Sequence, residues 1–182
     1  MLGAHTKAEL FAVLVAWKAV RQSGWPQLAP LVALRAAQWP TMNEAALRAE
    51  VQSLIDELSK PECAVRLFWK FVPDLMYRGY NANFLADSGY KGPGNLLDKN
   101  DIHPEVGWAR QGAKYRADDF DVINNTTGVR DIIERQDQAG GTMWLHTVKS
   151  AVRTATGEAI GVLGMYEVID GATAAKLQRR PR

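Results

Sequence analysis

The side chains best suited to catalysis do not form a recognisable catalytic motif in this sequence. Asp118 and Asp119 are adjacent, and because neighbours in a helix point about 100° apart, the two carboxylates make a poor acid–base pair. Ser88 and Ser150 lack a Ser-His-Asp signature, and residues 92–94 (Gly-Pro-Gly) have the composition of a turn, not of a phosphate-binding loop. We therefore expect a protein that is not an enzyme, with a small α+β enzyme working in a cavity as a competing class.

A single cysteine, Cys63, excludes an internal disulfide and a Cys-rich zinc site. The formal charge of +2 is too small to indicate a nucleic-acid surface. The most apolar stretch, residues 10–20, is interrupted by Lys18 and is shorter than the roughly 20 residues of a membrane-spanning helix. We therefore expect a cytoplasmic protein with no membrane span and no evident nucleic-acid partner.

Lys149 is the most informative charged residue because it ends a run, Trp144 to Lys149, that is typical of a β-strand. Successive side chains of a strand point to opposite faces, which places Leu145, Thr147 and Lys149 on one face. An ammonium group in a partly apolar pocket must find an anionic or carbonyl partner or lose its proton. Either a bound molecule supplies that partner, or the lysine head reaches solvent or pairs with a local Asp or Glu.

The elements before this strand are predicted to be helical. Residues 6–22, 28–38 and 42–59 read as three helices, because prolines separate them and two of them begin with a Thr-x-x-Glu capping box. The third helix carries an apolar stripe at a spacing of four, three and four, formed by Leu47, Val51, Leu54 and Leu58. Such a stripe either packs inside the protein or forms a short coiled coil.

The composition changes after residue 61 to aromatic and β-branched runs separated by turn residues. Strands are predicted at 65–72, 76–80, 129–137, 142–152 and 158–168, with helices at 81–88 and 112–125 between the second and third strands. This order predicts an α+β domain with an antiparallel sheet. We divide the chain into a helical segment (1–60), a sheet domain (61–170) and a basic C-terminal tail (171–182).

Three groups of residues resemble the PAS family of bacterial sensory domains. The first joins Phe68-Trp69-Lys70 to residues 77–84 (Tyr-Arg-Gly-Tyr-Asn-Ala-Asn-Phe), and the second is residues 115–119 (Tyr-Arg-Ala-Asp-Asp). The third and most specific is residues 144–149 (Trp-Leu-His-Thr-Val-Lys), followed by 157–164 (Gly-Glu-Ala-Ile-Gly-Val-Leu-Gly) and Asp170. Two segments depart from the family pattern: residues 71–73 (Phe-Val-Pro) replace a short acidic turn, and residues 171–173 (Gly-Ala-Thr) replace the start of a long signalling helix.

The resemblance implies a PAS fold: a five-stranded antiparallel sheet of order two-one-five-four-three, with helices on one face and the α-helical N-terminal segment on the other face or on a partner. It also implies a pocket between the sheet and the middle helices. The ligand-binding residues that it implies are Lys149, Thr147, Leu145, Tyr166, Trp108, Tyr115 and Phe84. Val162, Gly164 and Val168 would face the same pocket, Phe120 would add a wall, and Trp144 and Val148 would lie buried beneath the N-terminal helices.

The function implied by the resemblance is sensing of a small molecule that directs an anionic or carbonyl group at Lys149 and Thr147. The signal would pass through a homodimer or partner contacts to an effector supplied by another protein. A ligand-free interaction module is one alternative. A haem or flavin sensor is another: His103 is the candidate haem ligand, and Trp108 or Tyr166 could contact a flavin. Flavin photochemistry itself needs a cysteine that the sheet domain lacks in its middle helices.

Overall fold

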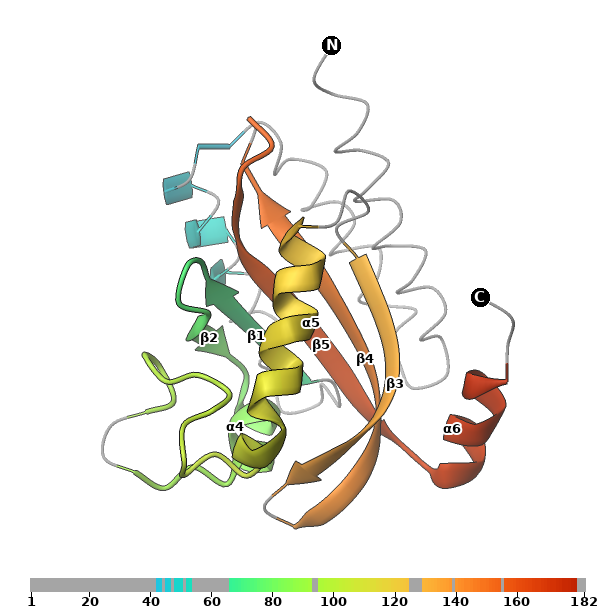
Figure 1. The fold of residues 1–182 in the computed structure, drawn as a ribbon. Coiled ribbons are helices and arrows are strands. Elements are labelled where there is room, and N and C mark those ends of the chain that lie inside the picture. Colours follow the sequence, from blue (N-terminus) through green and yellow to red (C-terminus); the bar gives the residue numbers. More distant parts are fainter. Residues whose placement is uncertain are drawn as a thin grey trace.

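A computed structural model describes residues 42–43, 45–46, 48–50, 52–53, 66–92, 95–124, 129–138, 140–154 and 156–179. Its centre is a five-stranded antiparallel sheet in the order β2-β1-β5-β4-β3 (Figure 1). The strands are β1 (Arg66–Phe71), β2 (Met76–Tyr80), β3 (Val129–Gln138), β4 (Gly141–Arg153) and β5 (Ala159–Ile169). The predicted α+β class and the predicted strand order are confirmed.

Strand pairing determines which side chains share a face of the sheet. Thr147 lies opposite Tyr166, and Lys149 lies opposite Gly164, which in turn lies opposite Phe68 of β1. Because directly opposed residues of an antiparallel pair point to the same face, one row of side chains from three strands lines the side that the middle helices cover. We call this side the inner face.

The helices of the inner face begin and end at specific local signals. In α4 (Ala82–Ser88) the Asn81 side chain accepts a hydrogen bond from the backbone of Phe84, and Gly89 ends the helix at a φ of 62°. The short 3₁₀ helix η3 (Ala109–Gln111) leads directly into α5 (Gly112–Asn124). Helix α5 lies across the sheet (Figure 1) and buries Tyr115, Asp118, Asp119 and Val122. Because these residues are spaced by three, one and three positions, they lie on one face of the helix, and this face packs against the sheet.

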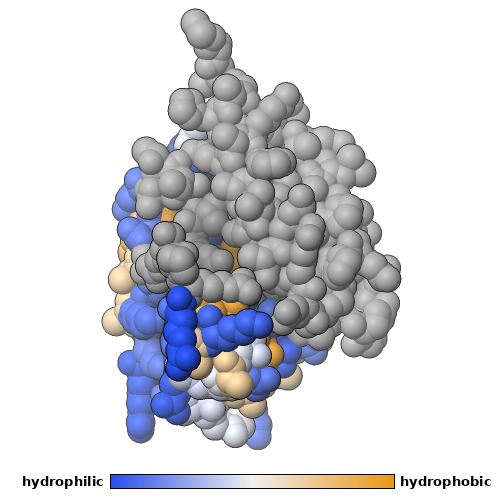
Figure 2. Space-filling view, turned by 90° about the vertical axis from the view of Figure 1, so that its right-hand side faces the viewer, coloured by the Kyte–Doolittle hydropathy of each residue, from blue (hydrophilic) through white to orange (hydrophobic). Residues whose placement is uncertain are grey.

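The segment predicted as a basic tail begins with a helix, α6 (Gly171–Gln178). Asp170 caps it by accepting a hydrogen bond from the backbone of Thr173 at 2.7 Å, a signal that the sequence interpretation did not use. Ala174 is fully buried, so α6 is attached to the sheet at the end of β3 and β4. The described surface on this side of the molecule mixes hydrophilic residues with smaller hydrophobic ones (Figure 2).

The outer face of the sheet is buried and mostly apolar, with Leu67, Trp69, Val148, Leu163 and Met165 each at most 2% exposed. Val148 is therefore buried as predicted, whereas Trp144 is only half-buried and lies beside Gly171 of α6. The apolar stripe predicted at residues 47–58 lies outside the described residues. Within the described part, the Arg48 guanidinium stacks 3.1 Å from the centre of the Phe71 ring at the end of β1.

Candidate ligand cavity

A small cavity lies between the inner face of the sheet and the middle helices. Its free volume is about 20 Å³, little more than the space of one water molecule. The lining consists of aromatic rings on one side and paired polar groups on the other. The lining residues are Phe68, Lys70, Tyr77, Phe84, Asp101, Trp108, Tyr115, Glu134, Gln136, Thr147, Lys149 and Tyr166.

Phe84 of α4 is the centre of the aromatic side. Its ring lies 4.9 Å from that of Phe68, 5.3 Å from that of Tyr77 and 5.2 Å from that of Trp108. The Phe68 ring lies directly over Gly164, where a Cβ atom would collide with it. Glycine at this position of β5 therefore lets an aromatic ring lie close to the sheet.

The polar side is a buried network of two lysines and two aspartates. Lys70 Nζ lies 2.5 Å from Asp101 Oδ2 and 2.7 Å from Asp119 Oδ2. The other oxygen of Asp119 lies 2.6 Å from Lys149 Nζ, and Lys149 also donates to the Tyr115 carbonyl at 3.1 Å. The network has no net formal charge, and none of its side chains is more than 4% exposed.

The network shifts the pKa of two of its members in opposite directions. Burial alone lowers the pKa of Lys70, but the carboxylates of Asp101 and Asp119 outweigh burial and hold this pKa above the ordinary value of 10.5. Burial alone raises the pKa of Asp119, but Lys149 and Lys70 outweigh burial and hold this pKa below the ordinary value of 3.8. Each ion is therefore stabilised in its charged form by its partners.

Three tyrosines around the cavity are held in the neutral form. Tyr77 donates to Asp101 at 2.5 Å, Tyr166 donates to Asp87 at 3.0 Å, and Tyr115 donates to Gln111 at 2.9 Å. Burial, together with neighbouring carboxylates, raises the pKa of all three phenols. All three hydroxyl protons are thus committed to protein acceptors.

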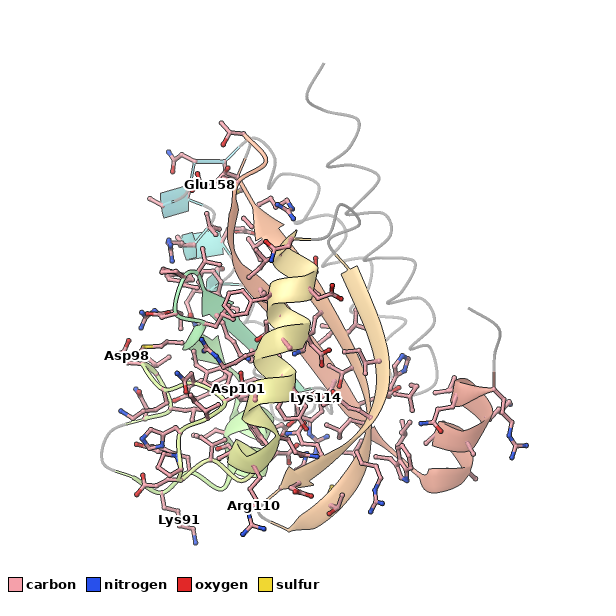
Figure 3. All side chains as sticks on the ribbon, viewed as in Figure 1. Lys91, Asp98, Asp101, Arg110, Lys114 and Glu158 are labelled. Carbon is pink, nitrogen blue, oxygen red and sulfur yellow. The ribbon has the colours of Figure 1, made fainter. Side chains whose placement is uncertain are left out.

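Strand β3 contributes an inward row of polar side chains. Glu134 accepts a hydrogen bond from Thr147 Oγ1 at 2.9 Å and pairs with Lys114, which lies on the side of α5 that faces β3 and β4 (Figure 3). Gln138 donates to Asp87 at 3.5 Å. Gln136 lies between these two residues, is 5% exposed and lines the cavity.

The structure brings six of the seven sequence-predicted ligand residues to the cavity wall: Lys149, Thr147, Tyr166, Trp108, Tyr115 and Phe84. The seventh, Leu145, is fully buried in the adjoining core without lining the cavity. Lys149 pairs with Asp119. The sequence left two partners open for this lysine, a bound molecule or a local Asp or Glu, and Asp119 is such a local partner. Whether a ligand reaches these residues stays a prediction.

Two residues that were predicted to face the pocket, Phe120 and Val168, do not line the cavity. Phe120 is 40% exposed, because five residues after Tyr115 the helix has turned about 140° away from the sheet. Val168 is 37% exposed near the end of β5. Val162 is buried on the inner face but does not line the cavity.

Several wall residues were missed from the sequence, chiefly Lys70, Asp101, Glu134 and Gln136. Lys70 had a readable signal, since strand alternation places it on the same face as Phe68. Asp119 was weighed only as a catalytic partner of Asp118, whereas its spacing of four residues from Tyr115 places it on the same helix face. Asp101 lies in a loop without periodicity, so its position depends on tertiary packing.

Comparison with known proteins supports the fold assignment. No protein-family model and no curated protein matches the chain. A solved structure of the phage VqmA–DPO complex superposes with a TM-score of 0.58 at 18% identity, covering 72% of this chain and 57% of that chain. A Vibrio cholerae VqmA–ligand–DNA complex superposes with a TM-score of 0.53 at 16% identity, covering 62% of this chain and 49% of that chain. A light-oxygen-voltage domain studied with a flavin analogue superposes with a TM-score of 0.51 at 15% identity. This match covers 72% of this chain and 95% of that chain.

The fold is that of a PAS domain. The PAS fold matched here spans about half the length of the VqmA chains. In the described part of the chain, no helix has the length and apolar composition needed to cross a membrane.

The described residues of this PAS domain carry no specific signal for a bound flavin or haem. At a free volume of about 20 Å³ the cavity has no room for an organic ring of any kind, a flavin included, unless its walls move. His103, the candidate haem ligand, lies away from the cavity against Tyr90, with 5.7 Å between the ring centres. The described residues also contain no group of three or more His, Cys, Asp or Glu side chains placed to hold a metal ion.

Proposed function

We propose that this PAS domain is a sensing module that binds a small organic molecule in the cavity between the sheet and the middle helices. The observation that supports it best is the buried Lys70–Asp119–Lys149–Asp101 network on the cavity wall. Removing four charges from water is costly, and apolar side chains of similar volume would stabilise a core as well or better. Buried ions with shifted pKa values beside a cavity are typical of functional sites.

The charge balance of the wall favours a neutral ligand. Asp119 and Asp101 already neutralise the two lysines, and Glu134 is paired with Lys114. An anionic ligand would therefore have to displace a carboxylate, whereas a carbonyl needs only a remaining N–H of Lys149. We propose that the ligand directs a carbonyl group at Lys149, close to Thr147.

Binding requires the cavity to enlarge. A cavity of about 150 Å³ is known to hold a benzene-sized molecule, and the free volume here is about 20 Å³. The aromatic rings around Phe84 must therefore shift, or the helices must move from the sheet. Ligand binding is thereby coupled to a conformational change, as a sensor requires.

We propose that the signal passes through a homodimer to an effector in trans, in a cytoplasmic protein without enzymatic activity. Dimerisation would use the apolar stripe predicted at residues 47–58. One solved VqmA structure of similar fold is described as a dimer of a LuxR-type receptor whose conformation differs without target DNA. That receptor supports a dimeric sensor as the working arrangement for this chain.

A ligand-free interaction module is the second candidate, and the small cavity favours it. If the walls never separate, the domain is simply a packed core that serves contacts with other proteins. The two candidates differ in whether any small molecule stabilises the folded state.

A fragment screen decides between them. Neutral heterocycles, carboxylates, phosphates and DPO, the ligand named in the VqmA structures, are tested by thermal shift on the whole chain. The matched control is Thr147→Leu, which fills part of the cavity. At least one neutral compound should raise the melting temperature of the wild type but not of Thr147→Leu. If no compound stabilises the wild type, or if both proteins respond equally, the proposed function is wrong.

A further inference from the structure

One amide on the cavity wall is not used by the fold. The Gln136 side chain is 5% exposed, yet it takes part in none of the hydrogen bonds formed by the described residues. Its neighbours in the same inward row, Glu134 and Gln138, are both bonded. The amide atoms are not among the fully enclosed polar atoms of the described residues that lack a partner, so they touch accessible space, and the residue lines the cavity that a ligand would enter.

The other polar groups on the wall are already occupied. Tyr77, Tyr115 and Tyr166 donate to protein acceptors, and Thr147 donates to Glu134. The lysines and aspartates bond one another. Among the carboxylate, amide, hydroxyl and ammonium groups of the described wall, Gln136 is therefore the one whose full hydrogen-bonding capacity remains for a ligand.

The chemistry of an amide defines what it can recognise. A glutamine presents a donor and an acceptor side by side in one plane, and its complement is a flat edge that carries an acceptor beside a donor, as on adenine. The aromatic rings around Phe84 supply apolar walls for a flat ring. A carboxylate lacks the donor, and the wall has no unpaired positive charge to hold it.

Building on the proposed ligand-binding function, we propose that Gln136 selects the ligand through a two-point hydrogen bond. The ligand class is then a neutral, planar ring with an N–H group beside a carbonyl or a ring nitrogen, such as a lactam or an amino-substituted nitrogen heterocycle. Gln136 is the specificity-determining residue, and Lys149 supplies a second contact to a carbonyl on the ring.

The first test uses the protein without ligand. Gln136→Met keeps the shape of the side chain and removes an amide that has no partner in the protein, so the melting temperature of the whole chain should not fall. The matched control, Gln138→Met, removes a bonded amide two residues along the same row and should lower the melting temperature. If Gln136→Met lowers the melting temperature as much as Gln138→Met does, Gln136 has a structural partner and the inference is overturned.

The second test compares two probes of nearly equal shape, 2-pyridone and N-methyl-2-pyridone. Only 2-pyridone offers a donor beside its carbonyl, so the wild type should bind it about tenfold more tightly by calorimetry. In Gln136→Met this preference should disappear, with the affinity for N-methyl-2-pyridone unchanged. A preference that persists in Gln136→Met, or two probes that fail to bind while other fragments do, would overturn the inference alone. If no fragment binds at all, the proposed function fails with it.

Discussion

Asp119 is the residue on which the charged wall of the cavity depends. Each of its two oxygens faces a different ammonium group, Lys70 at 2.7 Å and Lys149 at 2.6 Å, and its side chain is fully buried. Through Lys70 the network continues to Asp101 and the Tyr77 hydroxyl. Asp119 therefore joins helix α5 directly to strands β1 and β4. Through Lys70 it also reaches the loop that contains residue 101.

Replacing Asp119 by Asn should cost about 3–5 kcal/mol, because it leaves two buried ammonium groups with one carboxylate between them. Urea unfolding measures this loss. Asp121→Asn is the matched control, an exposed position two residues further along α5, where a change of at most about 0.5 kcal/mol is expected. Similar small losses in both variants would mean that the network does not form in solution.

The pH dependence of the melting temperature is a second measurement of the buried ion network. Because the pKa of Asp119 lies below 3.8, its interactions stabilise the fold above pH 3.8 and are lost as the pH falls through the folded-state value. The pKa of Lys70 lies above 10.5, so its contribution is complete below pH 10.5 and is lost as the pH rises through its folded-state value. Melting temperatures measured across this range should fall at both ends, and the acid loss should be smaller in Asp119→Asn.

Strand alternation was enough to predict the strand residues of the site, but the helix and loop residues also depend on helix geometry and tertiary packing. Thr147, Lys149 and Tyr166 follow from period two once the inner face is known. Phe120 was misplaced because aromatic character was weighed above its angular position on the helix. Gln136 was missed because β3 reads as a mostly polar strand, and nothing in its sequence shows which polar group goes unpaired.

At the scale of elements, the joint between β1 and α4 depends on Asn81. Its side-chain oxygen accepts from the backbone of Phe84 at 3.1 Å, which caps α4, and from the backbone of Leu67 at 3.1 Å. One oxygen therefore begins the helix and satisfies a strand N–H group. It also fixes the position of Phe84, the central ring of the cavity.

Asn81→Ala should therefore cost more than the loss of an ordinary cap. Loss of a cap costs about 1 kcal/mol, and a buried backbone N–H group left unpaired adds about 1–3 kcal/mol. The control, Asp170→Ala, removes an exposed cap that accepts a hydrogen bond from the backbone of Thr173 at the start of α6, and it should cost less. Chemical denaturation of both variants checks the order. An equal loss would show that the second hydrogen bond of Asn81 contributes nothing.

Element boundaries were predictable where two signals agreed. The predicted strand 76–80 matches β2, and the other predicted strands differ by no more than one residue at either end, because alternation and turn residues mark the same limits. Helix α6 was missed because residues 171–173 depart from the family pattern, and the Asp170–Thr173 capping signal was not considered.

At the scale of the whole molecule, the sheet presents two faces of different character. The inner face carries the cavity and its charged network, whereas the outer face carries Leu67, Trp69, Val148 and Met165, all buried. The sequence predicts that residues 1–60 pack on the outer face or on a partner, and most of that segment lies outside the described residues. Among those described, Arg48 lies over Phe71 and Gln52 lies beside Gly79, so this segment contacts the β1–β2 end of the sheet.

A chain that begins at residue 61 should therefore expose the outer face. Large buried apolar side chains contribute about 1.5–3 kcal/mol each, so exposing several of them removes most of the 5–15 kcal/mol that stabilises an ordinary domain. We expect the shortened chain to bind the dye ANS, to associate in sedimentation experiments and to melt at a lower temperature than the whole chain. Arg48→Ala in the whole chain removes one described contact and should cause only a small part of this loss. A shortened chain that is as stable and as well dispersed as the parent would show that the first 60 residues do not cover this face.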